Sequence, residues 1–596
     1  MAQPKGRSAT TTSLPSPIGG WNARDSLANM SPTDAVQLVN FFPTPTDVTL
    51  RKGFTKASTG ITGKVNSLMN YTETSGYKLF AAAGTKIYDA KPSTAVEYFS
   101  GITSDKFQHV NLTNQAGHFL VACNGVDPVL VFDGTAWFKM ANTTTAQTIT
   151  SMDRTSPSNV VTVTTASAHG LITNNRVTIT ASSEVTFLGA HVITVTSPTT
   201  FTFVSTATTT VTGATGTYTV LGIVGATVGA TTYTIDSSKF INVNLFKNRL
   251  YFTEKDTLNC WYLDVNAVGG TATPLFFGGI ARNSGYLQAM GTWTLDAGQG
   301  ADDYAVFVTS MGEVIVYNGT NPDTAETWQL KGVWQLGQTF SRRCFFKWAG
   351  DLLLLTQDGL VPLASALQSS RLDPRINLTD KIYYAVSQAA TNYFDLFGWQ
   401  INYYASENML ILSIPTSVGM EQYVMHTITK SWARFTGIEA YCWEVSGDAD
   451  MHFGGNGYVG KFYDTTSDNG ATIVATAQQA YSYFDSPGQL KRFTLVRPIL
   501  QTDNGIPTVL CGISVDFDTT PLINQIAFNP NASKVGKWDV AKWDEANWGG
   551  ELVTTKIWQG VTGLGFSGSV NMNVASAGIE LHWASTDYVM ERGGVL

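Results

Sequence analysis

The chain has 596 residues, of which 43% are hydrophobic and only 14% are charged, and its formal net charge is −8. An ordinary globular protein is about 25% charged. This composition, rich in Gly, Thr, Val and aromatic residues, therefore favours an all-β protein with extensive buried contact surface. The acidic balance argues against a general nucleic-acid binder, which shows a basic face, but leaves open a protein that touches DNA without holding it.

The five cysteines are scattered and form no C-x-x-C pair, so the sequence predicts neither a disulfide framework nor a zinc site. Residues 1–17 contain no apolar run of the kind found in secretory signals, and no stretch of about 18 apolar residues occurs that would span a bilayer. We therefore expect a soluble protein made in a reducing cytoplasm, without membrane insertion.

Residues 1–55 are expected to form an extended N-terminal arm with one short helix. The sequence "SPTDAVQLVNFF" predicts that helix, because Ser31 can cap it, Pro32 suits its first position and Asp34 complements the helix dipole. Turn-rich segments lie before and after it.

The arm also contains candidates for contacts with another subunit. Arg24 and Asp25 can form charge-assisted hydrogen bonds that fix a register, and Trp21 lies three residues earlier. The alternative is that the arm packs on its own propeller. "LRKGF" at Leu50–Phe54 is mildly basic, which indicates either a contact with DNA or an acidic partner, or a solvated face.

From about residue 56 a unit recurs that predicts two strands joined by a short turn, with Asn-Gly or Asp-Gly nearby. Its clearest copies are Lys78–Ala90, His118–Gly134, Tyr304–Gly319 and Met451–Asp464. Outside one large gap the units lie very roughly 40 to 60 residues apart, the spacing of four-stranded propeller blades. We expect a β-propeller of about six to eight blades formed by residues 56–140 and 222–484; a set of β-sandwiches is the alternative.

The gap is residues 141–221, which are rich in Thr, Val and Ser and contain only four charged residues. Segments such as "NVVTVTT" alternate branched and polar side chains, as half-buried strands do. We expect a small β domain inserted between two blades, on the outer side of the propeller. Residues 485–596 are expected to form a C-terminal β region.

The C-terminal region contains "KWDVAKWDEANWGG", in which Trp538, Trp543 and Trp548 recur every fifth residue. Neither a helix nor a strand returns a side chain to the same side at this interval. The aspartate after each of the first two tryptophans suits an Asx-turn. We expect successive tight turns that present three rings on one side, either sealing this region against its own propeller or entering a neighbouring subunit.

Catalytic signatures are missing from the sequence. The seven histidines include no pair four residues apart, and no phosphate-binding loop and no G-x-S-x-G occur. We therefore expect no catalytic residue, no metal site, no cofactor and no enzymatic activity. A glycosidase pair of carboxylates stays open, because sequence alone cannot say which acidic residues meet.

The arm resembles the opening of tail proteins from short-tailed bacteriophages, in which G-G-x-N-x-R-D-x-L is followed by M-x-P-x-D-A, N-x-F-P and R-x-G-F. The matching residues are Gly19, Gly20, Asn22, Arg24, Asp25, Leu27, Met30, Pro32, Asp34, Ala35, Asn40, Phe42, Pro43, Arg51, Gly53 and Phe54. The C-terminal "VRP", the tryptophan segment and the closing "ERGGVL" are similar to that group as well. The family is the podovirus tail nozzle, also called tail tubular protein B or packaged-DNA stabilisation protein.

This resemblance implies a structural virion protein with a β-propeller protomer. Six copies would form a ring below the portal-adaptor complex, with a channel for retaining and ejecting genomic DNA. The implied partners are the tail adaptor protein, tail fibre or spike proteins and, transiently, the DNA. The implied location is the virion tail, and the host cytoplasm during assembly. A propeller-type tail protein that binds or depolymerises host glycans is the alternative.

Overall fold

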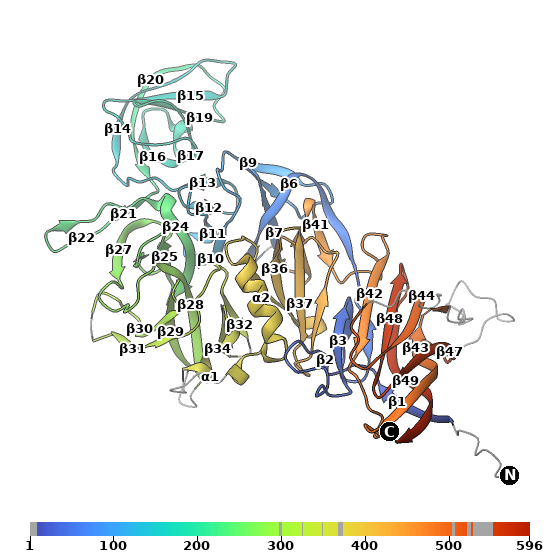
Figure 1. Ribbon diagram of the computed structural model, residues 1–596. Coiled ribbons are helices and arrows are strands. Elements are labelled where there is room, and N and C mark those ends of the chain that lie inside the picture. Colours follow the sequence, from blue (N-terminus) through green and yellow to red (C-terminus); the bar gives the residue numbers. More distant parts are fainter. Residues whose placement is uncertain are drawn as a thin grey trace, which may run out of the picture. The chain divides into compact units, whose positions relative to one another are not determined.

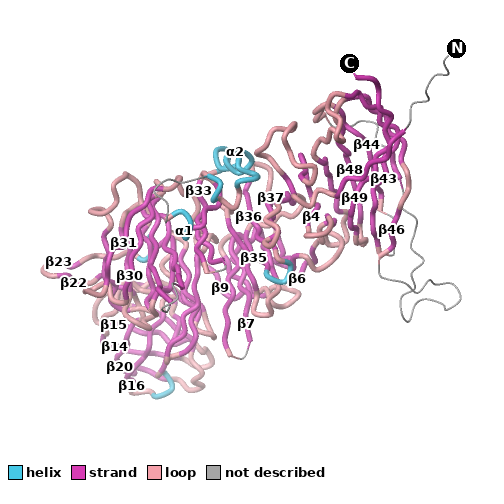
Figure 2. The backbone as a smooth tube through the Cα atoms, turned by 90° about the horizontal axis from the view of Figure 1, so that it is seen from below, coloured by secondary structure: helices cyan, strands magenta, loops and turns pink. Residues whose placement is uncertain are grey.

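The computed structural model describes residues 9–595, except for 75, 297–300, 325, 349, 368–373, 504–506, 521–525 and 529–551. Strands make up most of this part of the chain, as the magenta segments of Figure 2 show. The α-helices of the described residues are α1 (Leu363–Ala366) and α2 (Tyr383–Tyr393). The all-β class predicted from composition and alternation is confirmed.

The chain divides into two units, each with its own sheets. The central unit comprises Thr59–Thr356 and Pro362–Leu372. The terminal unit comprises Met1–Ser58, Gln357–Val361 and Asp373–Leu596. Residues 373–484, expected in the propeller, therefore belong to the same unit as the two chain ends.

The central unit contains four antiparallel sheets in which consecutive strands pair in chain order, as in propeller blades (Figure 1). The first is β6 (Phe54–Glu73), β7 (Gly76–Ala83), β8 (Lys86–Asp89) and β9 (Val96–Ser100). The second is β10 (Gln108–Asn114), β11 (Gly117–Cys123), β12 (Leu130–Phe132) and β13 (Trp137–Lys139). The third is β24 (Phe240–Phe246), β25 (Arg249–Glu254), β26 (Asn259–Tyr262) and β27 (Gly270–Phe276). The fourth is β28 (Leu287–Asp296), β29 (Ala301–Thr309), β30 (Glu313–Gly319) and β31 (Trp328–Gln335).

Successive sheets share apolar cores, because alternate side chains of each strand point toward the next sheet. Phe80 and Phe132 belong to the core between the first two sheets, and Val131 and Phe252 to the next one. A third core joins the last two sheets. A further pair, β32 (Phe345–Trp348) and β33 (Asp351–Thr356), packs on β28. The propeller is thus four-bladed, and the expectation of six to eight blades is wrong, because the later hairpins fold into sheets of the terminal unit.

The inserted residues form a seven-stranded sheet with a core of its own. Its strands are β14 (Gln147–Arg154), β15 (Val160–Thr165), β16 (Arg176–Ser182), β17 (Gly189–Val192), β18 (Thr194–Ser197), β19 (Thr200–Val204) and β20 (Val211–Val220). The chain enters and leaves at one point, where Ile223 N–H donates to the Ala141 carbonyl at 2.8 Å. Beyond it, β21 (Ile223–Gly225) joins β27, and β22 (Thr227–Val228) pairs with β23 (Thr231–Thr232).

The terminal unit is built on two large sheets that share one core, to which Leu38, Val424, Val496 and Tyr588 contribute. In the ten-stranded sheet the order is β35 (Gln400–Tyr404), β36 (Met409–Pro415), β37 (Met420–His426), β38 (Trp432–Phe435), β3 (Asp34–Val39), β42 (Ile473–Gln479), β48 (Gly568–Ser576), β44 (Thr508–Val515) and β45 (Ile526–Phe528), with β2 (Gly20–Trp21) beside β3. In the seven-stranded sheet the order is β4 (Phe41–Pro43), β5 (Val48–Leu50), β49 (Leu581–Val595), β43 (Gln489–Thr502) and β46 (Val553–Thr555), with β1 (Ala9–Pro15) on β49 and β47 (Gln559–Gly565) on β43. A further antiparallel meander contains β39 (Cys442–Val445), β40 (Met451–Gly454) and β41 (Asn456–Phe462).

The helix expected from Ser31 is wrong. Asp34 N–H donates to the Ser31 carbonyl at 2.9 Å, which closes a single turn, and the chain then continues as β3. β3 pairs with β42, and Ala35 and Leu38 enter the core. The Ser-Pro-Thr-Asp sequence suits a turn as well as a helix start, and tertiary strand pairing decides between them.

Candidate functional site

The first half of the N-terminal motif forms a buried polar cluster around Asn22. The Asn22 side-chain Nδ2 donates to Asp25 Oδ2 at 2.9 Å and to Asp34 Oδ2 at 2.8 Å. Its Oδ1 accepts from the backbone N–H of Arg24 at 3.1 Å and of Asp25 at 3.0 Å. A carboxamide offers two donors and one two-lone-pair acceptor, so every hydrogen bond of this buried group is satisfied.

The proposed assembly residues of the arm have partners within the terminal unit. Arg24 Nε lies 2.8 Å from Asp25 Oδ1, and its guanidinium also pairs with Asp380. The hydrogen bond from Arg24 holds the pKa of the Asp25 carboxyl below its usual value. The Trp21 ring packs edge-on against Tyr423, with centroids 5.1 Å apart. Arg24 and Asp25 stay partly exposed, so a further contact with another subunit remains a prediction.

Lys381 strengthens the same attachment from a distant part of the sequence. Its Nζ donates to Asp34 Oδ1 at 2.7 Å and to the Gly19 carbonyl at 2.8 Å. Its carbonyl accepts from the Ala23 N–H at 2.9 Å. No local pattern indicates this role for Lys381. The remaining proposed assembly residues, Trp538, Trp543 and Trp548, lie outside the described residues.

The second half of the motif surrounds Arg51, whose side chain is fully buried. Its two Nη atoms bond Asp468 Oδ1 and Oδ2 at 2.8 and 2.7 Å. Nε donates to Asn40 Oδ1 at 2.9 Å, and the remaining two N–H groups donate to the carbonyls of Lys52 and Thr436. All five donors of the guanidinium are used. Arg51 is therefore a buried structural cation, and its predicted role in a basic contact or solvated face is wrong.

Gly53 and Phe54 complete this cluster by close packing. A Cβ on Gly53 would lie 2.0 Å from the Ser467 carbonyl oxygen, so only glycine lets the two backbones approach this closely. Phe54 contacts Phe453 edge-on at 5.0 Å and stacks on Tyr458 at 6.0 Å. Together with the Arg51–Asp468 pair, these contacts hold the loop of residues 463–468 against the end of β5.

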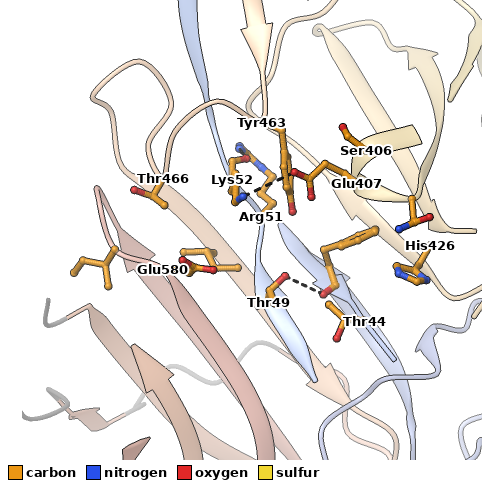
Figure 3. A pocket seen from close by; sticks show the side chains of 14 residues that line it. Thr44, Thr49, Arg51, Lys52, Ser406, Glu407, His426, Tyr463, Thr466 and Glu580 are labelled. Carbon is orange, nitrogen blue, oxygen red and sulfur yellow. Dashed lines mark hydrogen bonds and ion pairs between the residues drawn. The ribbon is translucent and has the colours of Figure 1, made fainter. Parts of the chain in front are cut away.

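A pocket with a volume of about 250 Å³ lies on this scaffold (Figure 3). Its walls come from the β4–β5 hairpin, the turn after β35, the end of β37, the loop after β41 and the turn before β49. The lining residues are Phe42, Thr44, Thr49, Leu50, Arg51, Lys52, Ser406, Glu407, Asn408, His426, Tyr463, Thr466, Ile579 and Glu580. No sequence signal predicts this site, because its segments are hundreds of residues apart.

The charged groups of the pocket are paired with opposite charges. Lys52 Nζ lies 3.9 Å from Glu407 Oε1 and 5.4 Å from the centre of the Tyr463 ring. Glu580 Oε1 lies 3.0 Å from His582 Nε2, and Asp47 Oδ2 lies 2.8 Å from His582 Nδ1. The hydrogen bond to Asp47, reinforced by the one to Glu580, raises the pKa of His582. A neutral imidazole donates through one nitrogen only, so contacts of both ring nitrogens with carboxylates favour the protonated form of His582.

Burial shifts the pKa values of two other ring side chains of the pocket, His426 and Tyr463. Burial lowers the pKa of His426, so its imidazole is neutral near pH 7. Its Nδ1 contacts the Thr429 hydroxyl at 3.2 Å, and its ring lies 5.5 Å from that of Phe42. Burial also raises the pKa of Tyr463, whose hydroxyl therefore stays protonated.

Glu407 and Glu580 both line the pocket, so they are candidates for the glycosidase pair of carboxylates that the sequence alone left open. A glycosidase uses one carboxyl as a general acid, which is normally kept protonated in an apolar pocket. The side chains of Glu407 and Glu580 are instead 33% and 43% exposed, and each has a cationic neighbour. Neither side chain therefore lies in the apolar surroundings that a general acid of this kind needs.

The described residues lack the side-chain grouping of a metal site and the helix of a membrane span. They contain no group of three or more His, Cys, Asp or Glu residues arranged to hold a metal ion. The five cysteines are buried and are not joined in disulfide bonds. Within the same residues, no helix has the length and apolar character needed to cross a membrane.

No family model and no curated protein matches this chain. Among solved structures, Raptor from Chaetomium thermophilum is 6% identical over 70% of this chain and 28% of its own, with a TM-score of 0.31. A putative 6-phosphogluconolactonase from Bacteroides fragilis is 10% identical over 63% and 90%, with a TM-score of 0.25. The phage phi92 endosialidase is 11% identical over 51% and 63%, with a TM-score of 0.14. Likenesses this low carry no argument about activity or partners.

Proposed function

We propose that this chain is the tail nozzle protein of a short-tailed bacteriophage, a structural component of the virion. In this role six copies form a ring below the portal-adaptor complex, and the ring lines a channel for DNA retention and ejection. Its partners are further copies of itself, the tail adaptor protein and tail fibre or spike proteins. The proposal starts from the resemblance of the N-terminal arm to that family.

One observation carries the proposal beyond sequence likeness. Several residues that match the nozzle pattern attach the arm to the rest of the terminal unit, namely Asn22, Asp34, Asn40, Arg51 and Gly53. Each position requires its own residue type, because the groups are buried and their hydrogen bonds are mutual. The residues of the pattern thus coincide with one structural attachment, which supports the resemblance.

The low charge and acidic balance of the chain support the same role. A channel wall that attracted phosphates strongly would displace counterions, bind the DNA tightly and slow its passage. A net charge of −8 over 596 residues is compatible with a conduit through which DNA moves without being held.

The decisive experiment is native mass spectrometry of the full chain, alone and mixed with the adaptor protein from the same phage. We expect a ring of six copies, formed either alone or on the adaptor. A chain that stays monomeric under both conditions would count against the proposal.

Antibody labelling of intact virions tests the proposed location. We expect the label at the tail tip; labelling of the capsid shell would contradict the proposal.

The alternative, a tail protein that depolymerises host glycans, predicts a different readout. Purified protein incubated with host surface polysaccharide would release reducing sugar. We expect no release, since Glu407 and Glu580 are open to solvent and neutralised by neighbouring cations. Release of reducing ends that is lost in Glu407→Gln or Glu580→Gln would establish the enzyme instead.

A further inference from the structure

We propose that the pocket of the terminal unit is a binding site for a single neutral sugar unit. It is lined by residues of the β4–β5 hairpin and by Ser406–Asn408, Tyr463, Thr466 and Glu580 (Figure 3). The inference rests on the pocket alone and is independent of the virion role. A chain that does not form rings could still bind a sugar, and a chain that forms rings could fail to bind one.

The charges of the pocket select a neutral ligand. Arg51 forms part of the lining, but all five of its donors are used within the protein, so it offers nothing to an anion. Lys52 is balanced by Glu407, and Glu580 by His582. An anionic ligand would meet the carboxylates of Glu407 and Glu580, and a cationic ligand would meet the ammonium group of Lys52. A neutral, polar molecule is repelled neither by the carboxylates nor by the ammonium group.

The free polar groups of the pocket match a polyhydroxylated ligand. Within the described part of the chain, the side chains of Ser406, Asn408 and Thr466 form no hydrogen bond. The Glu407 carboxylate lies 3.9 Å from Lys52 Nζ, which is longer than a hydrogen bond. Carboxylate, amide and hydroxyl groups together can both accept from and donate to sugar hydroxyls.

The size and the apolar part of the lining agree with one sugar unit. Pockets for drug-sized ligands have volumes of roughly 300–1,000 Å³, and this one, at about 250 Å³, is smaller. Phe42, Leu50 and Ile579 contribute apolar surface beside the polar groups. A sugar ring also has both polar and apolar surface. Its hydroxyls form hydrogen bonds, whereas its C–H faces lack hydrogen-bonding groups.

The pocket is also rigid before any ligand enters. Tyr463 and Asn408 both have left-handed backbones, with φ of 63° and 52°, a conformation that is unusual for tyrosine. Such backbones persist where the surrounding structure fixes them, and they concentrate at ligand sites. Here the Arg51–Asp468 pair fixes the loop that contains Tyr463 and Thr466. A ligand would therefore not have to order these walls.

Saturation-transfer NMR on the full chain tests the proposal. The neutral probes are glucose, galactose, mannose and N-acetylglucosamine at about 10 mM, suited to the millimolar affinity of a single small unit. Glucosamine and glucuronate serve as the cationic and anionic comparators. We expect saturation transfer to at least one neutral sugar and less to both charged ones. No transfer to any neutral sugar, or a preference for a charged one, overturns the proposal.

Two matched variants place the binding in this pocket. Ser406→Trp fills the pocket from an exposed position and should abolish the signal. Ser417→Trp adds the same side chain at an exposed position of the β36–β37 turn, outside the pocket, and should leave the signal unchanged. Glu407→Gln should weaken binding about ten-fold by removing a charged acceptor. Unchanged binding in Ser406→Trp would show that the sugar binds elsewhere, which also overturns the proposal.

Discussion

Arg51 and Asp468, 417 residues apart in the chain, form a two-point ion pair with bonds of 2.8 and 2.7 Å. The Arg51 side chain is 0% exposed and that of Asp468 is 12% exposed. The pair joins the end of the N-terminal arm to the loop that follows β41. It therefore links the part of the chain that resembles nozzle proteins to the wall of the pocket.

Arg51→Met should lower the free energy of unfolding by about 3–5 kcal/mol, because it leaves a mostly buried carboxylate without its cation. Denaturant unfolding of the full chain measures this loss. Lys52→Met is the control: its side chain is 40% exposed and its ion pair is long, so the change should stay within about 1 kcal/mol. Equal losses in the two variants would contradict a structural role specific to Arg51.

His582 should make stability depend on pH. Its pKa is raised above 6.5 in the folded protein by the hydrogen bonds to Asp47 and Glu580. A raised pKa means that folding favours the protonated form. The stabilisation is therefore complete below about pH 6.5 and is lost as the pH rises through the folded-state pKa.

The measurement is unfolding free energy across this pH range, in the native chain and in His582→Gln. The native chain should lose stability as the pH rises above about 6.5, and the variant should lack that step. Asp47→Asn should reduce the step, because it removes one of the two partners of the imidazolium. An identical pH profile in the native chain and His582→Gln would show that the contact is energetically silent.

Deleting the inserted sheet should leave a folded remainder. Ala141 and Gly222 lie side by side in a parallel bridge, so the two ends of the insertion are close together and joining Asn142 to Gly222 spans a short distance. The inserted sheet has its own core, and its links to the blade include the Arg176–Asp133 ion pair at 2.6 Å. We expect a soluble protein that melts cooperatively in calorimetry. Aggregation or non-cooperative melting would mean that the insertion is integral to the propeller core.

Two substitutions in the arm separate stability from assembly. Asn22→Ala removes a buried side chain with four hydrogen bonds and should cost about 1–3 kcal/mol of monomer stability. Arg24→Ala removes partly exposed ion pairs and should cost no more than about 1 kcal/mol. We expect Arg24→Ala to weaken ring formation in native mass spectrometry while its unfolding midpoint stays near that of the native chain. A normal ring in that variant would remove Arg24 from the assembly surface.

The sequence by itself determined the features that depend on neighbouring residues. Alternation in "NVVTVTT" corresponds to β15, and the hairpin units at Lys78–Ala90 and His118–Gly134 contain β7–β8 and β11–β12. An alternation with a period of two reflects the local geometry of a strand with one buried face. It can be recognised without knowing which strand is the partner.

Only the tertiary structure decided the features that depend on distant pairing. "SPTDAVQLV" became a turn and β3, not a helix, because β42, more than 430 residues later, completes its hydrogen bonds. The hairpin of β36 and β37 joined the terminal unit because β3 of the arm and the C-terminal strands β48 and β44 extend its sheet. The pocket likewise exists only where five separate segments meet. Hydrophobic alternation predicts that a segment forms a strand, whereas the packing of the whole chain determines which strands pair with it.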